Sequence, residues 1–145
     1  MKKFIVLTAV FFIGVFFAQE PIKNLSKEDI PIEVANLVDI STVTFMIDTE
    51  PSFPGGMSAF RKEFSQNFDT SALEKTDGGT LKTVVYYVVE VDGSILYVKA
   101  IGENESFNKE AERTLKSIKT KYAPAKVNNL VVRHILRMPL SMNFK

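Results

Sequence analysis

An Asp-Gly pair between two runs of β-forming residues constrains the fold more than any other part of this chain. The runs, 80–91 and 94–101, are rich in β-branched and aromatic residues. Asp92-Gly93 between them is a strong signal for an antiparallel hairpin. A two-residue turn sets the register. It predicts a core face made of Val85, Tyr87, Val89, Leu96, Val98 and Ala100.

The opposite face of this predicted hairpin is also apolar. It carries Tyr86, Val88 and Tyr97. Soluble proteins rarely leave a large continuous apolar patch in contact with water. We therefore expect either residues 19–42 or a partner protein to cover part of this second face.

Two amphipathic helices are predicted to flank the hairpin. The first follows Pro54-Gly55-Gly56, ends near residues 67–69 and has an apolar face of Met57, Phe60, Phe64 and Phe68. The second begins at Ser106 or Asn108, both competent N-caps, and ends near Lys121. Its apolar stripe consists of Phe107, Ala111, Leu115, Ile118 and Tyr122.

Alternation with period two predicts two further strands. Val43, Phe45 and Ile47 alternate with other residues before the first helix, and a long final strand spans 130–144. Pro139 has no N–H, so we expect it at a sheet edge or a bulge. The predicted fold class is α+β, a small antiparallel sheet with two helices packed on one face in the order β-α-β-β-α-β. The final strand presents on one side His134, Leu136, Met138, Leu140, Met142 and Phe144.

The N-terminus has the layout of a secretory signal peptide. Lys2 and Lys3 precede an apolar run that ends at Ala18, before Gln19 and Glu20. The run is shorter than the roughly 20 apolar residues that a membrane-spanning helix needs. We expect cleavage after residue 18 and a periplasmic protein. An uncleaved anchor in the inner membrane is the alternative.

The net charge and the cysteine content limit which partners and covalent modifications the chain can have. Loss of residues 1–18 lowers the Lys+Arg count from 18 to 16, against 17 Asp+Glu, which gives a net charge of −1. Such a surface has no general attraction for nucleic acid. The chain has no cysteine, so it forms no disulfide and carries no thioether-linked lipid. Residues 19–42 are expected to be a tether, part of which packs as a short helix or strand, before a domain at 43–145.

Four segments resemble the TonB C-terminal domain family of Bacteroidetes-type envelope proteins. They are Pro-Ser-Phe-Pro-Gly-Gly at 51–56, Tyr-Val-Val-Glu-Val-Asp-Gly-Ser-Ile at 87–95, Tyr-Ala-Pro-Ala-Lys at 122–126 and Met-Pro-Leu-Ser-Met at 138–142. The resemblance covers about residues 43–144. It departs from the family pattern at 68–72, where Phe-Asp-Thr-Ser-Ala replaces Tyr-Pro-x-x-Ala, and at Tyr122, where the family has Trp.

The resemblance implies a partner and a binding edge. In the family, the last strand pairs with an extended segment of an outer-membrane TonB-dependent receptor, so main-chain bonds supply the affinity. It implies that the partner is such a receptor or another envelope protein, and a homodimer is a further option. The implied partner-binding residues are Arg133, His134, Ile135, Leu136, Arg137, Met138 and Leu140. An equally simple interpretation is that these residues only face the core and the solvent.

The sequence contains no recognisable catalytic constellation. His134 is the only histidine, and without cysteine it forms neither a zinc cluster nor a Cys/His pair. Glu110 and Glu112 do not face each other on a helix, and we expect both on a solvated face. No enzymatic activity, cofactor or metal site is predicted.

Two functions compete for a chain of this kind. One is a stand-alone interaction module of the envelope, and the other is an energy transducer, or auxiliary transducer, for TonB-dependent receptor transport. Residues 20–42 reach roughly 80 Å when fully extended at about 3.3–3.6 Å each. They are not a long Pro-rich spacer. The sequence therefore favours the interaction module.

Overall fold

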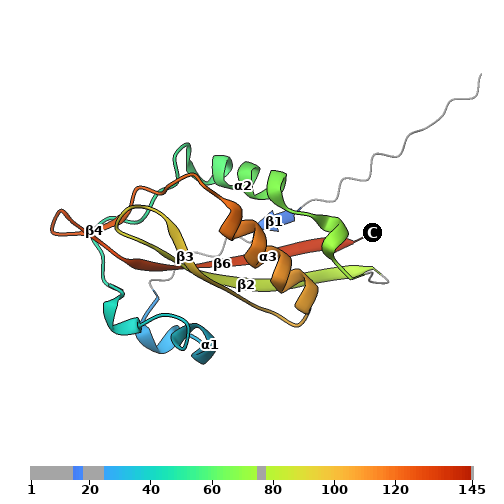
Figure 1. Ribbon diagram of the computed structural model, residues 1–145, viewed down its shortest axis with the longest axis horizontal. Helices are drawn as coiled ribbons and strands as arrows, with labels where there is room; N and C mark the ends of the chain where they lie inside the picture. The colour runs from blue at the N-terminus through green and yellow to red at the C-terminus, as the bar shows by residue number, and fades with distance from the viewer. Residues whose placement is uncertain (1–14, 18–24, 75–77, 145) are drawn as a thin grey trace, which may run out of the picture.

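The computed structural model describes residues 25–74 and 78–144, together with the backbone of residues 15–17. The rest of the predicted signal peptide, 1–14 and 18, lies outside the described residues. The fold class is α+β with a small antiparallel sheet, as predicted (Figure 1). Its elements are β1 Val15–Phe17, η1 Lys27–Asp29, α1 Ile32–Ala35, η2 Ile40–Thr42, α2 Gly56–Asn67, η3 Thr70–Ala72, β2 Gly79–Val89, β3 Ile95–Ile101, α3 Glu105–Ser117, β4 Ala125–Val127, β5 Leu130–Val132 and β6 His134–Phe144.

The main sheet has the strand order β1-β6-β2-β3, so the chain's two longest strands lie in its middle. β2 and β6 pair antiparallel along their whole length, from Gly79 opposite Phe144 to Val89 opposite His134. β4 and β5 form a separate two-stranded sheet. The turn between them is Asn128-Asn129, and both residues adopt the left-handed conformation that such a tight hairpin requires.

The turn between β2 and β3 is one residue longer than predicted. The Gly93 N–H donates to the Glu90 carbonyl, and the Glu90 N–H donates to the Ser94 carbonyl. Three residues therefore form the loop, and Gly93 has a left-handed φ of 82°. This combination of a tight turn and a left-handed third residue is a common hairpin connection. The predicted two-residue turn was wrong by this one position.

A β-bulge at Tyr97 restores the predicted register farther from the turn. Tyr97 has a φ of 53°, and the pairing shifts by one residue at this point. Beyond it Val85 lies opposite Ala100, as predicted. Before it Ile95, rather than the predicted Leu96, packs against the main core. Leu96 is instead 46% exposed.

The strand predicted before α2 does not form. Burial of residues 43–48 still broadly follows the predicted alternation, since Val43 is buried while Met46 is 87% exposed. Their backbone groups, however, bond to scattered partners rather than to one strand. The Thr44 N–H donates to the Arg133 carbonyl and the Asp48 N–H to that of Lys126. The alternation of apolar residues in the sequence thus predicted which side chains are buried, but not the backbone pairing of a strand.

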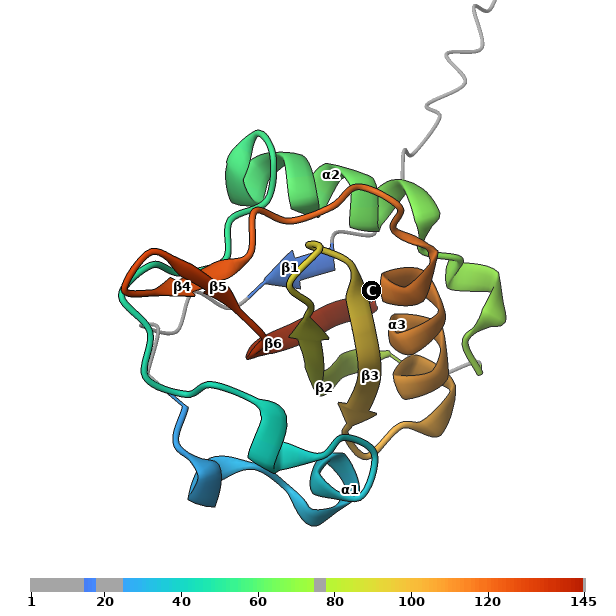
Figure 2. The same ribbon diagram turned by 60° about the vertical axis from the view of Figure 1, so that its left-hand side comes forward.

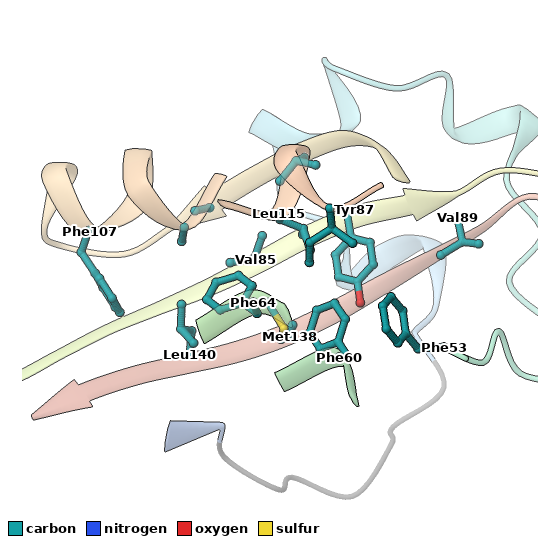
Figure 3. Close-up of a cluster of buried hydrophobic side chains, with 14 of the residues drawn as sticks. Phe53, Phe60, Phe64, Val85, Tyr87, Val89, Phe107, Leu115, Met138 and Leu140 are labelled. Atoms are coloured by element: carbon teal, nitrogen blue, oxygen red, sulfur yellow. The ribbon is translucent and has the colours of Figure 1, made fainter. Parts of the chain in front are cut away.

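The main core joins α2 and α3 to one face of the sheet (Figure 3). Phe60 and Phe64 of α2 are fully buried. Met57 was predicted to join them, but it lies in the first turn of α2 and is 50% exposed. The buried members are Phe53, Phe60, Phe64, Leu73, Val85, Tyr87, Val89, Val98, Ala100, Phe107, Ala111, Leu115, Ile118, Tyr122, Met138, Leu140 and Met142.

The predicted bounds of the second helix need correction. Asn104, rather than Ser106 or Asn108, is the N-cap, because its side chain accepts a hydrogen bond from the Phe107 N–H. α3 ends at Ser117. The residues after it continue as extended chain, yet Ile118 and Tyr122 are buried in the main core as predicted.

The second face of the sheet is covered by residues 25–45, so this part of the expected tether is packed. Val34 of α1 is fully buried there. Figure 2 shows α1 on the opposite side of the sheet from α2. This second cluster comprises Val34, Val38, Val43, Tyr86, Val88 and Ile135, with Leu25, Ile30, Ile40, Phe45, Val84 and Ile101 around it. No described helix is long and apolar enough to cross a membrane.

Two buried tyrosine hydroxyls meet inside the main core. The Tyr87 and Tyr122 oxygens are 3.0 Å apart. Burial raises the pKa of Tyr122 to about 12 and holds the pKa of Tyr87 well above 10. Because these pKa values exceed those of the unfolded chain, the neutral pair stabilises the fold fully below about pH 10. That stabilisation is lost as the pH rises through about 12.

We expect the free energy of unfolding to fall by about 2 kcal/mol between pH 10 and 12 through Tyr122. Tyr122→Phe should remove this part of the pH dependence, because phenylalanine has no proton to lose. Urea unfolding followed by circular dichroism at several pH values measures it. Tyr97→Phe is the control, since that ring is 40% exposed. An unchanged alkaline slope in Tyr122→Phe would contradict the assignment.

Candidate functional site

Strand β6 has a second edge, on the side away from β2, that already receives another segment of the chain. β1 pairs with it antiparallel, from Val15 opposite Met142 to Phe17 opposite Leu140. At the other end of the strand, the Thr44 N–H donates to the Arg133 carbonyl, 2.9 Å away. Extended chain therefore contacts both ends of this outer edge. Neither contact could be predicted from residue types or spacing.

Pro139 shows which backbone groups of β6 point toward this outer edge. It lies opposite Val84 inside the continuous β2–β6 ladder. Proline has no N–H to donate, so its nitrogen belongs on the side away from β2. Backbone groups alternate along a strand, so Ser141 also points outward, and it is the residue that pairs with Phe16 of β1. The outer edge of β6 is thus defined by its odd-numbered residues.

Arg133, the first of the implied binding residues, is engaged inside the protein. Its guanidinium pairs with both carboxylate oxygens of Glu90 at 2.8–3.0 Å, and it also contacts the Thr42 hydroxyl. It lies 5.5 Å from the ring centroid of Tyr97. The hydrogen bond to Glu90 raises the pKa of Arg133. Arg133 therefore ties η2 to the β2–β3 hairpin.

His134 is buried, and its side chain holds neighbouring backbone in place. Only 6% of the residue is exposed, and its Nδ1 lies 2.7 Å from the Thr44 carbonyl oxygen. A carbonyl only accepts, so Nδ1 carries the proton and donates. His134 thereby fixes residues 43–45 beside the beginning of β6.

The other implied residues divide between the two faces of the sheet. Met138 and Leu140 are buried in the main core, and Leu136 packs against it. Ile135 is fully buried in the second cluster. Arg137 is the one exposed side chain among the seven. A partner at this edge would therefore be held mainly by the backbone of β6.

Glu110 and Glu112 do not lie on a solvated face, contrary to expectation. Glu110 is 4% exposed and accepts hydrogen bonds from the Asp69 N–H and from the guanidinium of Arg113. Burial opposes ionisation, but these donors keep the pKa of Glu110 below its usual value. Glu112 accepts from the Ala100 N–H at 2.9 Å. Both carboxylates thus tie α3 to neighbouring backbone.

The outer edge of β6 can bind an extended backbone, and this is the clearest chemical capacity of the described structure. No group of His, Asp or Glu side chains in the part of the chain that the structure describes is arranged to hold a metal ion. Comparisons with protein-family models, curated proteins and solved structures give no match.

Proposed function

We propose that the mature chain is a periplasmic interaction module, similar to the TonB C-terminal family, that binds an extended peptide of an envelope partner. The peptide adds as a strand to the outer edge of β6. The observation that carries this proposal is the pairing of β1 with that edge, because β1 is itself a short extended segment. Main-chain hydrogen bonds supply the affinity in this mode of recognition.

The packing of residues 25–42 supports a module over an energy transducer. A transducer needs a long spacer, but Leu25 packs at the second cluster and Val34 and Val38 are buried in it. Only residues 19–24 then remain between the predicted cleavage site and this packed layer. Fully extended, they would span roughly 20 Å at about 3.3–3.6 Å each.

The periplasmic location rests on the predicted signal peptide. A membrane-spanning helix needs about 20 apolar residues, and the apolar run at the N-terminus is shorter than that. We expect the exported protein to begin at Gln19. Its intact mass, measured from the cell-envelope fraction, tests this. Recovery of the chain with Met1 in the inner membrane would favour the transducer instead.

The chain provides its own probe for strand addition. We expect a fluorescein-labelled peptide with the sequence of residues 14–19 to bind a chain that begins at Gln19. Hydrogen exchange should slow at the amides of β6, including Ser141. Ser141→Pro should abolish binding because proline removes the outward donor. Ser141→Ala, which keeps that N–H, should bind normally. Fluorescence anisotropy measures the affinity.

Ser141→Pro is suited to this test because Pro139 already occupies an equivalent position opposite β2. The β2–β6 ladder should therefore persist, and circular dichroism checks that the variant is folded. Arg137→Ala should weaken binding only modestly, since main-chain bonds tolerate the loss of a side chain. Equal affinity for the folded Ser141→Pro and Ser141→Ala variants would reject strand addition at this edge.

A further inference from the structure

The opposite edge of the sheet carries a hollow that strand addition at β6 does not use. It has a volume of about 450 Å³ and lies between residues 94–98 at the beginning of β3 and residues 116–121, which include the end of α3 and the chain just after it. This volume is within the roughly 300–1,000 Å³ range of ligand sites. β3 is an end strand of the sheet, and Figure 2 shows it next to α3.

Both ends of this edge of β3 are closed by protein contacts, whereas its middle faces the hollow. The Tyr122 N–H donates to the Gly93 carbonyl at 2.9 Å, and Glu112 accepts from the Ala100 N–H. Ser94 bonds toward β2 through its carbonyl. Because backbone groups alternate along a strand, those of Ile95 point toward the hollow. An edge of this kind can accept another extended backbone.

The far wall of the hollow is held in place. Ile118 is buried in the main core, and the Thr120 hydroxyl donates to a carboxylate oxygen of Glu63 at 2.8 Å. Tyr122 then bonds to Gly93, as described above. The wall is therefore formed before any ligand arrives, which lowers the entropy lost on binding.

Lysines give this hollow a positive charge. Lys116, Lys119 and Lys121 line it. Lys116 lies 3.7 Å from Glu112 and Lys121 lies 3.1 Å from Asp92, and both lysine side chains are more than half exposed. Lys119 makes no ion pair with any of the described residues. Two of the three lysines therefore already face a carboxylate, and Lys119 does not.

We propose that this hollow, between residues 94–98 and 116–121, is a second binding site, and that it takes an extended acidic peptide. The carboxylates of the peptide pair with the three lysines, and its backbone lies along β3. Complementary charge favours encounter and selects against neutral or basic partners. The site is independent of β6, so the chain can bridge two envelope proteins.

A short fluorescein-labelled peptide of alternating glutamate and valine is the probe. We expect it to bind the full chain at low salt and to weaken at physiological ionic strength, where charges are screened beyond about 8 Å. Replacing Lys116, Lys119 and Lys121 by glutamine should weaken binding roughly tenfold, given the modest energy of each exposed pair. Replacing them by arginine should retain it. A peptide of alternating glutamine and valine has no carboxylates. It should bind the unchanged chain no more tightly than the glutamate-valine peptide binds the lysine-to-glutamine variant.

The matched control removes the same amount of positive charge at lysines elsewhere on the surface. Lys62, Lys82 and Lys126 are exposed and lie outside the hollow. Replacing these three by glutamine should alter affinity less than about twofold by the same reasoning. Equal loss in both triple variants, or no loss in the first, would overturn the proposal. So would hydrogen exchange that slows along β6 instead of at residues 94–98.

Discussion

Phe64→Ala is expected to lower the free energy of unfolding by about 3–5 kcal/mol. Phe64 is fully buried between α2 and the sheet, and its ring lies 6.1 Å from that of Phe60 and 5.8 Å from that of Phe68. Truncation removes the transfer energy of the ring and leaves a cavity that close-packed neighbours fill only in part. Urea unfolding followed by circular dichroism measures the change.

Met57→Ala is the matched control for this prediction. It shortens another large apolar side chain in the same helix, but Met57 is 50% exposed. Its effect should stay below about 1 kcal/mol, as is usual for exposed positions. Similar losses for the two variants would show that α2 does not use Phe64 to anchor itself to the sheet.

Deletion of residues 1–42 is expected to have an even larger effect. It removes Val34 and Val38 and uncovers Tyr86, Val88 and Ile135 on the second face of the sheet. Each fully buried aliphatic side chain contributes about 1.5–3 kcal/mol. Since a whole domain is stable by only about 5–15 kcal/mol, the shortened chain should unfold or aggregate. Urea melts and size-exclusion chromatography test this.

A chain that begins at residue 25 separates this effect from simple shortening. It retains the whole second cluster and loses, of the described residues, only β1. We expect its urea midpoint to stay close to that of the chain that begins at Gln19. If the chain that begins at residue 43 were equally stable, residues 25–42 would be a tether after all.

Much of the fold could be predicted because local patterns and packing agree. Phe60 and Phe64 fall on one helical face, and that face is buried. The hairpin was predicted too, but its details depend on backbone geometry that residue types do not specify. Tyr97 takes a left-handed conformation that any residue other than glycine, asparagine or aspartate rarely adopts. Its bulge could not be predicted, and it reversed the positions of Ile95 and Leu96.

The candidate site was less predictable than the fold. Pro139 was expected at a sheet edge or a bulge, but β6 lies between β1 and β2. The missing donor of Pro139 indicates only which side of the strand faces away from β2. The contacts of Arg133 depend on Thr42, Glu90 and Tyr97, which are distant in the sequence and meet only in the folded chain. Burial of Glu110 likewise depends on the Asp69 backbone. Sequence periodicity carries no information about such contacts.

Gly93 gives this architecture a signature by which relatives could be recognised. A side chain at this position would collide with the backbone carbonyl of Tyr122 and would have to adopt an unfavourable left-handed conformation. The turn and the closure of β3 against residue 122 therefore both require glycine. In a set of homologous chains, we expect glycine here to persist with an aromatic residue at 122 after most surface positions have diverged. The persistence of these two residues would then indicate common descent where overall identity no longer does.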